Sequence, residues 1–197
     1  MSKRIITISR EFGSGGRTIG KLTAKALGIP CYDKDLIEKI AKESGLSEEF
    51  ISEQGEYAPN KSIFSYAFLG RDITGMSVND HMWIAQQNII KDLAEKGPCV
   101  IVGRCADYIL RGRDDCLNVF VHAPVEFKAE RIVRLYGENE EAPEKRLKEK
   151  DRRRKLNYEY FTEQKWGDTR NYHLCIDSSV VGIERSAEIL ALIAKDK

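Results

Sequence analysis

The sequence predicts an α/β fold of three layers, in which helices cover both faces of a five-stranded parallel sheet. Its short apolar runs are mostly continuous rather than alternating, which is typical of strands that are buried on both faces. Segments with helical spacing lie between these runs, so strands and helices alternate as in βαβ units. The chain has 197 residues. This length suits a single domain over 1–197 with mobile insertions and leaves little room for a second full domain.

The expected strands and helices alternate along the chain. Each helical segment has apolar residues three or four positions apart, and Gly28 and Gly97 are expected to end the first two helices. The expected strands are residues 4–8, 29–32, 99–102, 117–121 and 174–176. The expected helices cover about 19–26, 82–93, 125–136 and 183–193.

Two segments do not fit this core pattern. Residues 45–79 contain glycines and a proline that break any long element, and we predict a small inserted cap of short helices there. Residues 137–167 are highly charged and helical in their middle, and we predict a charged lid.

The composition excludes several classes of partner. Lys plus Arg number 32 and Asp plus Glu number 31, so a net charge of +1 gives no general attraction to nucleic acid or membranes. No stretch approaches the roughly 18 apolar residues of a membrane-spanning helix, and the start of the chain lacks a secretory signal. We therefore expect a cytoplasmic protein, monomeric or homodimeric, that binds neither nucleic acid nor membranes.

A glycine-rich loop leaves the first strand and enters the first helix. It reads ISREFGSGGRT, from Ile8 to Thr18. Glycines let backbone amides turn toward an anion, and the helix that follows presents unsatisfied N–H groups and the positive end of its dipole. This order predicts a phosphate cradle rather than a turn that merely connects two elements. Its predicted residues are Gly13, Ser14, Gly15, Gly16, Arg17 and Thr18.

The last two residues of the loop, Arg17 and Thr18, correspond to the lysine and the serine or threonine that end the Walker A motif. Arg17 can hold the β and γ phosphates of a nucleoside triphosphate, and the Thr18 hydroxyl can ligate Mg²⁺. The loop departs from that motif at two positions, with Glu11 in place of Gly and Arg17 in place of Lys. The guanidinium of arginine is planar and can bind a phosphate in two places, whereas the ammonium of lysine is a compact point charge. Phosphate binding should therefore survive the change, while catalytic efficiency is in question. The carboxylate of Glu11 must point away from the phosphates or help to hold the metal.

Two carboxylates follow the second expected strand. Asp33 and Asp35 should lie at the carboxyl edge of the sheet beside the phosphate loop, where ligands of such sheets bind. We interpret Asp33 as a catalytic and Mg²⁺-binding residue and Asp35 as a contact to the phosphate acceptor. The alternative is that Asp33 caps a helix over 34–42 and that Asp35 is an ordinary carboxylate of its first turn.

The charged segment has a basic helix face. Residues 144–155 read EKRLKEKDRRRK, with eight basic and three acidic residues, and Arg146, Lys150 and Arg154 recur every four positions. Cations on a closing segment stabilise the charge of a moving phosphoryl group and exclude water. The alternatives are a solvated, salt-bridged helix and an RNA-binding helix. The run is short and the chain nearly neutral, which argues against RNA.

Together these motifs resemble the cytidylate kinase-like family. The resemblance is carried by Ile8 to Arg17 followed by Tyr32-Asp33, because Ser-Arg-Glu begins the loop in this family and Glu11 and Arg17 are its expected residues. Weaker motifs extend it over nearly the whole chain: Val102-Gly103-Arg104, 151–154, Trp166-Gly167-Asp168, Asn171-Tyr172 and Ile176-Asp177. The resemblance implies a P-loop kinase fold, ATP with Mg²⁺ as the donor, and a nucleoside monophosphate, CMP or dCMP, as the acceptor.

The resemblance also implies where the acceptor binds. Cytidylate kinases carry Gly-Arg-Asp where this chain has Gly103-Arg104-Cys105. Arg104 is therefore expected to grip the acceptor phosphate, since a guanidinium binds a phosphate in two places. Asp107, two residues late, is the candidate for the missing carboxylate.

In the charged segment, the resemblance favours Asp151 and Arg154, with Arg152 and Arg153 as the next candidates. We interpret Arg154 as catalytic and the other three as contacts to the acceptor. Two other functions remain open. An Asp-x-Asp stretch also occurs at this place in shikimate kinases, which leaves a non-nucleotide acceptor possible. The absent loop lysine, together with Cys105, is compatible with a nucleotide-binding regulatory protein that has no turnover.

Overall fold

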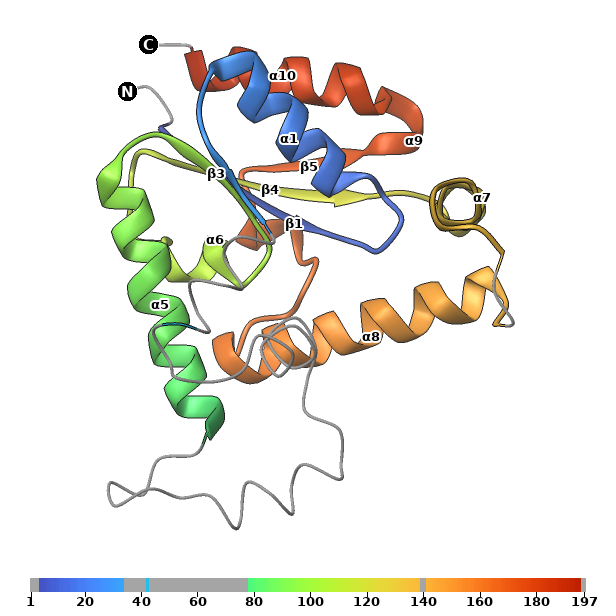
Figure 1. Ribbon diagram of the computed structural model, residues 1–197, viewed down its shortest axis with the longest axis horizontal. Coiled ribbons are helices and arrows are strands. Elements are labelled where there is room, and N and C mark those ends of the chain that lie inside the picture. Colours follow the sequence, from blue (N-terminus) through green and yellow to red (C-terminus); the bar gives the residue numbers. More distant parts are fainter. Residues whose placement is uncertain (1–3, 34–41, 43–77, 139–140, 196–197) are drawn as a thin grey trace.

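A five-stranded parallel sheet forms the centre of the computed structural model (Figure 1). The structure describes residues 4–33, 42, 78–138 and 141–195. The strands are β1 (Ile5–Arg10), β2 (Cys31–Tyr32), β3 (Cys99–Val102), β4 (Cys116–His122) and β5 (Leu174–Asp177). Their order across the sheet is β2-β3-β1-β4-β5, and every neighbouring pair is parallel. The predicted fold class is confirmed.

Helices cover both faces of the sheet. In Figure 1, α1 and α10 lie over one face, and α5, α6 and α8 lie on the opposite side. The helices are α1 (Gly16–Leu27), α5 (Val78–Lys96), α6 (Ala106–Ile109), α7 (Val125–Tyr136), α8 (Pro143–Thr162), α9 (Ser178–Val181) and α10 (Ile183–Lys195), with a 3₁₀ turn η1 (Thr169–Asn171). Within the described part of the chain, no helix combines the length and the apolar composition that crossing a membrane requires.

The predicted cap and the helix expected at 34–42 fall mainly outside the described residues. Lys42 is described, and positions 78 and 79 of the cap form the start of α5. The predicted contact Asp35 also lies outside the described residues. The helical middle of the predicted lid is α8, which occupies 20 residues of the segment.

β1 is buried on both faces, which explains its continuous apolar sequence. Ile5 packs with residues of α5 and α6, whereas Ile6 and Ile8 pack with residues of α1 and α10. Each of these side chains is fully buried, and such burial stabilises a fold by about 1.5–3 kcal/mol per side chain. The packing on both faces fixes the position of the loop that follows β1.

β1 extends two residues beyond the predicted end. Ser9 and Arg10 pair with Phe120 and Val121 of β4, so the strand ends at Arg10 rather than at Ile8. Both polar residues are buried, with exposed fractions of 7% and 8%. Because strand pairing continues past the apolar run, the sheet carries two polar side chains to its carboxyl edge.

α8 packs against α7 and the loop after β1. Leu147 of α8 is buried in a small cluster with Ala129 and Ile132 of α7, and Phe12 of the loop packs on the same cluster. The predicted lid therefore contacts the predicted phosphate loop in this conformation.

Candidate active site

The loop between β1 and α1 has the backbone conformation that its glycines allow. Gly13 and Gly15 have φ values of 83° and 87°, in the left-handed region that glycine enters at little cost. A Cβ at Gly13 would lie 3.0 Å from the backbone oxygen of Lys128, and one at Gly15 would collide with Ile183. The backbone conformation therefore favours glycine at both positions, and the close backbone oxygen of Lys128 adds a steric reason at Gly13.

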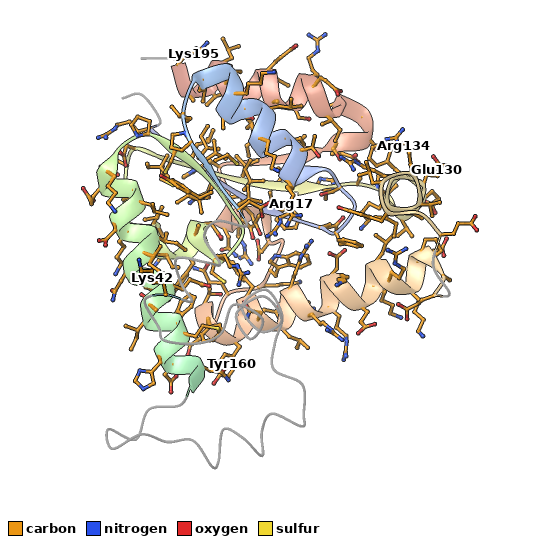
Figure 2. The ribbon with its side chains drawn as sticks, in the orientation of Figure 1. Arg17, Lys42, Glu130, Arg134, Tyr160 and Lys195 are labelled. Atoms are coloured by element: carbon orange, nitrogen blue, oxygen red, sulfur yellow. The ribbon has the colours of Figure 1, made fainter. Side chains whose placement is uncertain are left out.

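A cavity of about 190 Å³ lies beside this loop. Five of the six residues predicted for the phosphate cradle line it: Gly13, Gly15, Gly16, Arg17 and Thr18. Three further arginines, Arg10, Arg131 and Arg154, complete a strongly basic lining. We call this space the loop cavity. Its guanidinium groups and the N-terminus of α1 favour an anion. In Figure 2 the labelled Arg17 lies near the middle of the molecule, at the end of α1 that is nearer to α8.

Ser14 is the predicted cradle residue that does not line the loop cavity. Its side chain is fully buried, and its hydroxyl lies within hydrogen-bond distance of the backbone oxygens of Glu11 and Val121, at 2.9 and 3.1 Å. The Ser14 carbonyl accepts a hydrogen bond from the Ser178 hydroxyl at 2.6 Å. Ser14 therefore connects the loop to β4 and α9 rather than directing its hydroxyl toward a ligand.

Glu11 is paired with a cation that the sequence analysis did not single out. Its Oε2 accepts hydrogen bonds from Lys128 Nζ at 2.7 Å and from the backbone N–H of Ala123 at 3.3 Å. This pairing offsets the negative charge that a bound phosphate would otherwise meet. Lys128 is buried on the face of α7 that also carries Ala129 and Ile132. The sequence contained one sign of this pairing, because Lys128 lies on a helix face that also carries apolar residues.

Two arginines hold the oxygen atoms predicted to bind Mg²⁺. Arg17 Nε lies 2.6 Å from Asp33 Oδ2, and Arg131 Nη2 donates to the Thr18 hydroxyl at 3.0 Å. Arg131 is a further residue that the sequence analysis missed, although it too lies at the buried spacing of α7, one turn after Lys128. Burial lowers the pKa of Arg131.

The buried guanidinium of Arg131 points to an anionic ligand. Its Nε has no hydrogen-bond partner among the described residues, and the side chain lines the loop cavity. A buried donor without a partner costs about 1–3 kcal/mol. A phosphate in the cavity would satisfy this donor.

The oxygen donors of Thr18 and Asp33 fit Mg²⁺ bound together with a nucleotide. Mg²⁺ typically takes one or two protein oxygens, several waters and the phosphates of a substrate. Among the residues that the structure describes, no group of three His, Cys, Asp or Glu side chains is arranged to hold a metal ion unaided. This donor set therefore fits a metal whose remaining ligands come from a nucleotide and water.

A strained turn follows β3 at the same edge of the sheet. Gly103, Arg104 and Cys105 have φ values of 76°, 60° and 53°, so three consecutive residues are left-handed. This conformation costs a non-glycine residue roughly 1–2 kcal/mol, and such strain is concentrated at functional sites. Gln86 of α5 supports the turn, because its Nε2 donates to the Arg104 carbonyl at 2.9 Å.

A second, smaller cavity lies between this turn and α8. Its lining includes Arg10, Arg104, Arg154, Asn157 and Trp166. We call it the strand-end cavity. Arg10 and Arg154 line both cavities, so the two spaces adjoin at these side chains. Three arginines and no described carboxylate line the strand-end cavity, which suits a small anionic group.

Asp107, the candidate for the missing carboxylate, contacts the protein rather than a cavity. It is 4% exposed, lines neither cavity, and its Oδ2 accepts a hydrogen bond from the Tyr158 hydroxyl at 2.7 Å. The helix α6 turns the side chain toward α8, so Asp107 joins α6 to α8 instead of facing an acceptor. Burial raises the pKa of Asp107 to about 6.

Asp151 likewise contacts the protein rather than a cavity. Its Oδ1 accepts from the backbone N–H of Phe12 at 2.6 Å, and its Oδ2 lies 3.6 Å from Lys128 Nζ. Burial raises the pKa of Asp151 to about 6, while the Phe12 hydrogen bond and the nearby Arg154 and Lys128 cations oppose that rise.

Of the predicted lid arginines, only Arg154 reaches the cavities. Its Nη1 donates to the Arg10 carbonyl at 3.3 Å. Arg152 is exposed, and Arg153 pairs with Glu149 one turn earlier on α8. Neither of these two lines the loop cavity or the strand-end cavity, so the structure does not bring them to the expected acceptor site.

Known proteins resemble this chain in sequence over most of its length. Residues 5–180 match the cytidylate kinase-like family. A cytidylate kinase from Pyrococcus horikoshii is 25% identical over 178 residues, which is 90% of this chain and 81% of that protein. A cytidylate kinase from Aeropyrum pernix is 27% identical over 184 residues, which is 93% of this chain and 94% of that protein.

Solved structures share the fold. An uncharacterized protein from Eubacterium ventriosum superposes with a TM-score of 0.74 at 28% identity, over 98% of this chain and 99% of that one. A shikimate kinase from Acinetobacter baumannii in complex with shikimate gives a TM-score of 0.55 at 18% identity, over 98% and 94% of the two chains. The second likeness is one of fold.

Proposed function

The chain belongs to the cytidylate kinase-like family, and we propose that it transfers the γ-phosphoryl group of ATP to CMP or dCMP. The family and the shared fold support a kinase that acts on a nucleotide or another small molecule. The observation that carries the proposal is the pair of adjoining basic cavities at the carboxyl edge of the sheet. One has the features of a triphosphate cradle, and the other suits a small anion.

In this proposal the loop cavity binds the triphosphate. Backbone N–H groups at the start of α1 face the phosphates, Arg17 holds their β and γ oxygens, and Arg131 gains a partner for its buried Nε. Thr18 and Asp33 would hold Mg²⁺, which neutralises charge on the phosphates when it is bound. The Lys128 ammonium keeps Glu11 from repelling them.

The strand-end cavity binds the phosphate of the acceptor in this proposal. Arg104 grips it, and the acceptor phosphate is largely dianionic at neutral pH because its second pKa is about 6. One of its oxygens attacks the γ-phosphorus in line, while the bond to the bridging oxygen breaks and leaves its electron pair on ADP. A dianionic nucleophile loses no proton in this step, so the residues contribute mainly orientation and charge stabilisation.

α8 closes the site in this proposal. Arg154 reaches the junction of the two cavities from α8, and Asp151 ties the helix to the loop at Phe12. A segment held in this way keeps water from the γ-phosphoryl group, which would otherwise be hydrolysed.

The test is acceptor-dependent ADP formation from ATP and Mg²⁺, with CMP, dCMP, UMP, AMP, shikimate and gluconate as acceptors. We expect turnover with CMP or dCMP and its loss in Arg104→Ala. The exposed Arg111 offers the matched control Arg111→Ala, which should retain the wild-type rate. Turnover only with a compound that has no phosphate would contradict the acceptor that we propose.

A specific observation favours a non-nucleotide acceptor as the second candidate. Cys105 stands where cytidylate kinases carry aspartate, and the carboxylate of Asp107 accepts a hydrogen bond from Tyr158 instead of lining the strand-end cavity. The carboxylate expected to contact the cytosine is therefore missing from the described lining of the strand-end cavity. Turnover with shikimate or gluconate in the same panel would favour this candidate, and ATP binding without turnover would favour a regulatory protein.

A further inference from the structure

Arg10 lies at the junction of the two cavities. It is the last residue of β1, its exposed fraction is 8%, and it lines both the loop cavity and the strand-end cavity. The Walker A pattern gives this position no function, because it precedes the motif's first glycine position at Glu11.

Two glycines make room for the Arg10 side chain. A Cβ at Gly16 would lie 2.6 Å from the Cβ of Arg10, the side-chain atom nearest to the backbone. A Cβ at Gly103 would collide with Nη1 of Arg10 and lie 2.8 Å from its Cζ. The side chain therefore runs from the start of α1 to the strained turn after β3, and its guanidinium lies against Gly103.

Arg10 and Arg154 reach the junction from different parts of the fold. Arg154 comes from α8, and its Nη1 contacts the backbone oxygen of Arg10 at 3.3 Å. Arg10 comes from the central strand, whose pairing with β4 continues to Arg10 itself. A movement of α8 would withdraw Arg154 from the junction and leave Arg10 in place.

We propose that Arg10 is a further catalytic residue, whose guanidinium contacts the phosphoryl group as it passes from the loop cavity to the strand-end cavity. This inference rests on the proposed function. The phosphoryl group leaves ADP with the bond's electron pair and joins an acceptor oxygen, and Arg10 keeps its proton throughout. Its fixed charge stabilises the negative charge on the oxygens in transit, and a preorganised cation is most effective in a site that excludes water.

The test uses ADP, Mg²⁺ and aluminium fluoride, which mimics a phosphoryl group in transit, with and without CMP. Calorimetry gives the affinity for ADP and its tightening by aluminium fluoride. We expect Arg10→Gln to bind ADP with an affinity within about threefold of the wild type and to lose roughly 10- to 100-fold of the tightening. Arg10→Lys should retain part of the tightening, because lysine keeps the positive charge but lacks the planar, bidentate guanidinium.

Arg185, which is exposed on α10, gives the matched control Arg185→Gln, with wild-type tightening expected. Thermal unfolding checks that each variant is folded, and Arg10→Lys serves alone if Arg10→Gln does not fold. Full tightening in the Arg10 variants would overturn the inference. The inference would also be overturned if the variants lost as much affinity for ADP alone as for ADP with aluminium fluoride. A wild type that shows no tightening would overturn it as well.

The two proposals fail separately. If the wild type phosphorylates CMP and Arg10→Gln keeps the same kcat, the function stands and the inference about Arg10 falls. If no acceptor in the panel is phosphorylated but the tightening depends on Arg10, the inference stands and the acceptor assignment falls.

Discussion

The carboxylate of Asp151 accepts a hydrogen bond from the backbone N–H of Phe12 at 2.6 Å, across 139 positions of the sequence. It joins α8 to the phosphate loop, and Lys128 lies close to both this carboxylate and that of Glu11, at 3.6 and 2.7 Å. The strongly basic helix α8 is therefore attached to the loop through one of its few acids, and Lys128 links both carboxylates to α7.

Asp151→Ala should loosen this attachment. The substitution removes the partner of the Phe12 N–H, and an unsatisfied buried donor costs about 1–3 kcal/mol. We expect faster amide hydrogen exchange at Phe12 and along 144–155, and a lower kcat. Glu144→Ala, at an exposed position of the same helix, is the control. Unchanged exchange in Asp151→Ala would show that α8 is held mainly by other contacts.

Magnesium binding should depend on nucleotide binding. Arg17 and Arg131 occupy the oxygens of Asp33 and Thr18, so Mg²⁺ alone would have to displace two guanidinium groups. Triphosphate offers both arginines new partners and offers the metal further oxygens. Calorimetry should detect no binding of millimolar Mg²⁺ to the free protein and tight binding in the presence of ADP. Tight binding of Mg²⁺ alone would contradict this account.

The sequence predicted the fold because its strongest signals come from the buried sheet. The apolar run that begins at Ile5 is continuous because β1 is covered on both faces, and the glycines at Gly28 and Gly97 correctly placed the ends of α1 and α5. The exact strand ends were less accurate. β1 continues through Ser9 and Arg10 because their pairing with β4 depends on backbone register, which hydrophobicity does not report.

The candidate site was predicted only in part, because much of it is assembled by distant contacts. The order of glycines and cations in one loop is local, so the sequence alone indicated a loop that lines the larger cavity. Lys128, Arg131 and Gln86 came from α7 and α5, where the apolar spacing identifies a buried face but not its partner. Asp107 lies away from the expected acceptor site for a related reason. Its nearness in sequence to Arg104 suggested a shared site, but α6 turns it toward Tyr158.

Gly103→Ala should impair both stability and activity. The φ of 76° is unfavourable for alanine, and the new methyl group would collide with the guanidinium of Arg10. We expect a loss of about 1–3 kcal/mol in the free energy of unfolding, with a fall in kcat because Arg10 is displaced. Gly112→Ala is the matched control, since a Cβ there meets no atom within 4 Å. Its unfolding free energy should stay within about 0.5 kcal/mol of the wild type.

Asp107 should make the stability of the fold depend on pH. Burial raises its pKa in the folded protein to about 6, above the value of about 3.9 in an unfolded chain. Between these values the folded state holds more protons, so this contribution to the free energy of unfolding is full below pH 4 and is lost as the pH rises through 6.

Asp107→Asn removes this titration while keeping the shape of the side chain. Denaturant unfolding of both proteins from pH 4 to 7 should show the wild type losing about 2–3 kcal/mol relative to the variant. A constant difference between the two proteins across this range would mean that the carboxyl group does not titrate there.

A crystal structure with Mg²⁺ and the β,γ-imido analogue of ATP would show whether the loop cavity binds the triphosphate. We expect the β and γ phosphates in the loop cavity, where they face the N–H groups of Gly15 and Gly16. The guanidinium groups of Arg17 and Arg131 should be turned from Asp33 and Thr18 to phosphate oxygens. Phosphates bound elsewhere, with both arginines still on Asp33 and Thr18, would contradict this expectation.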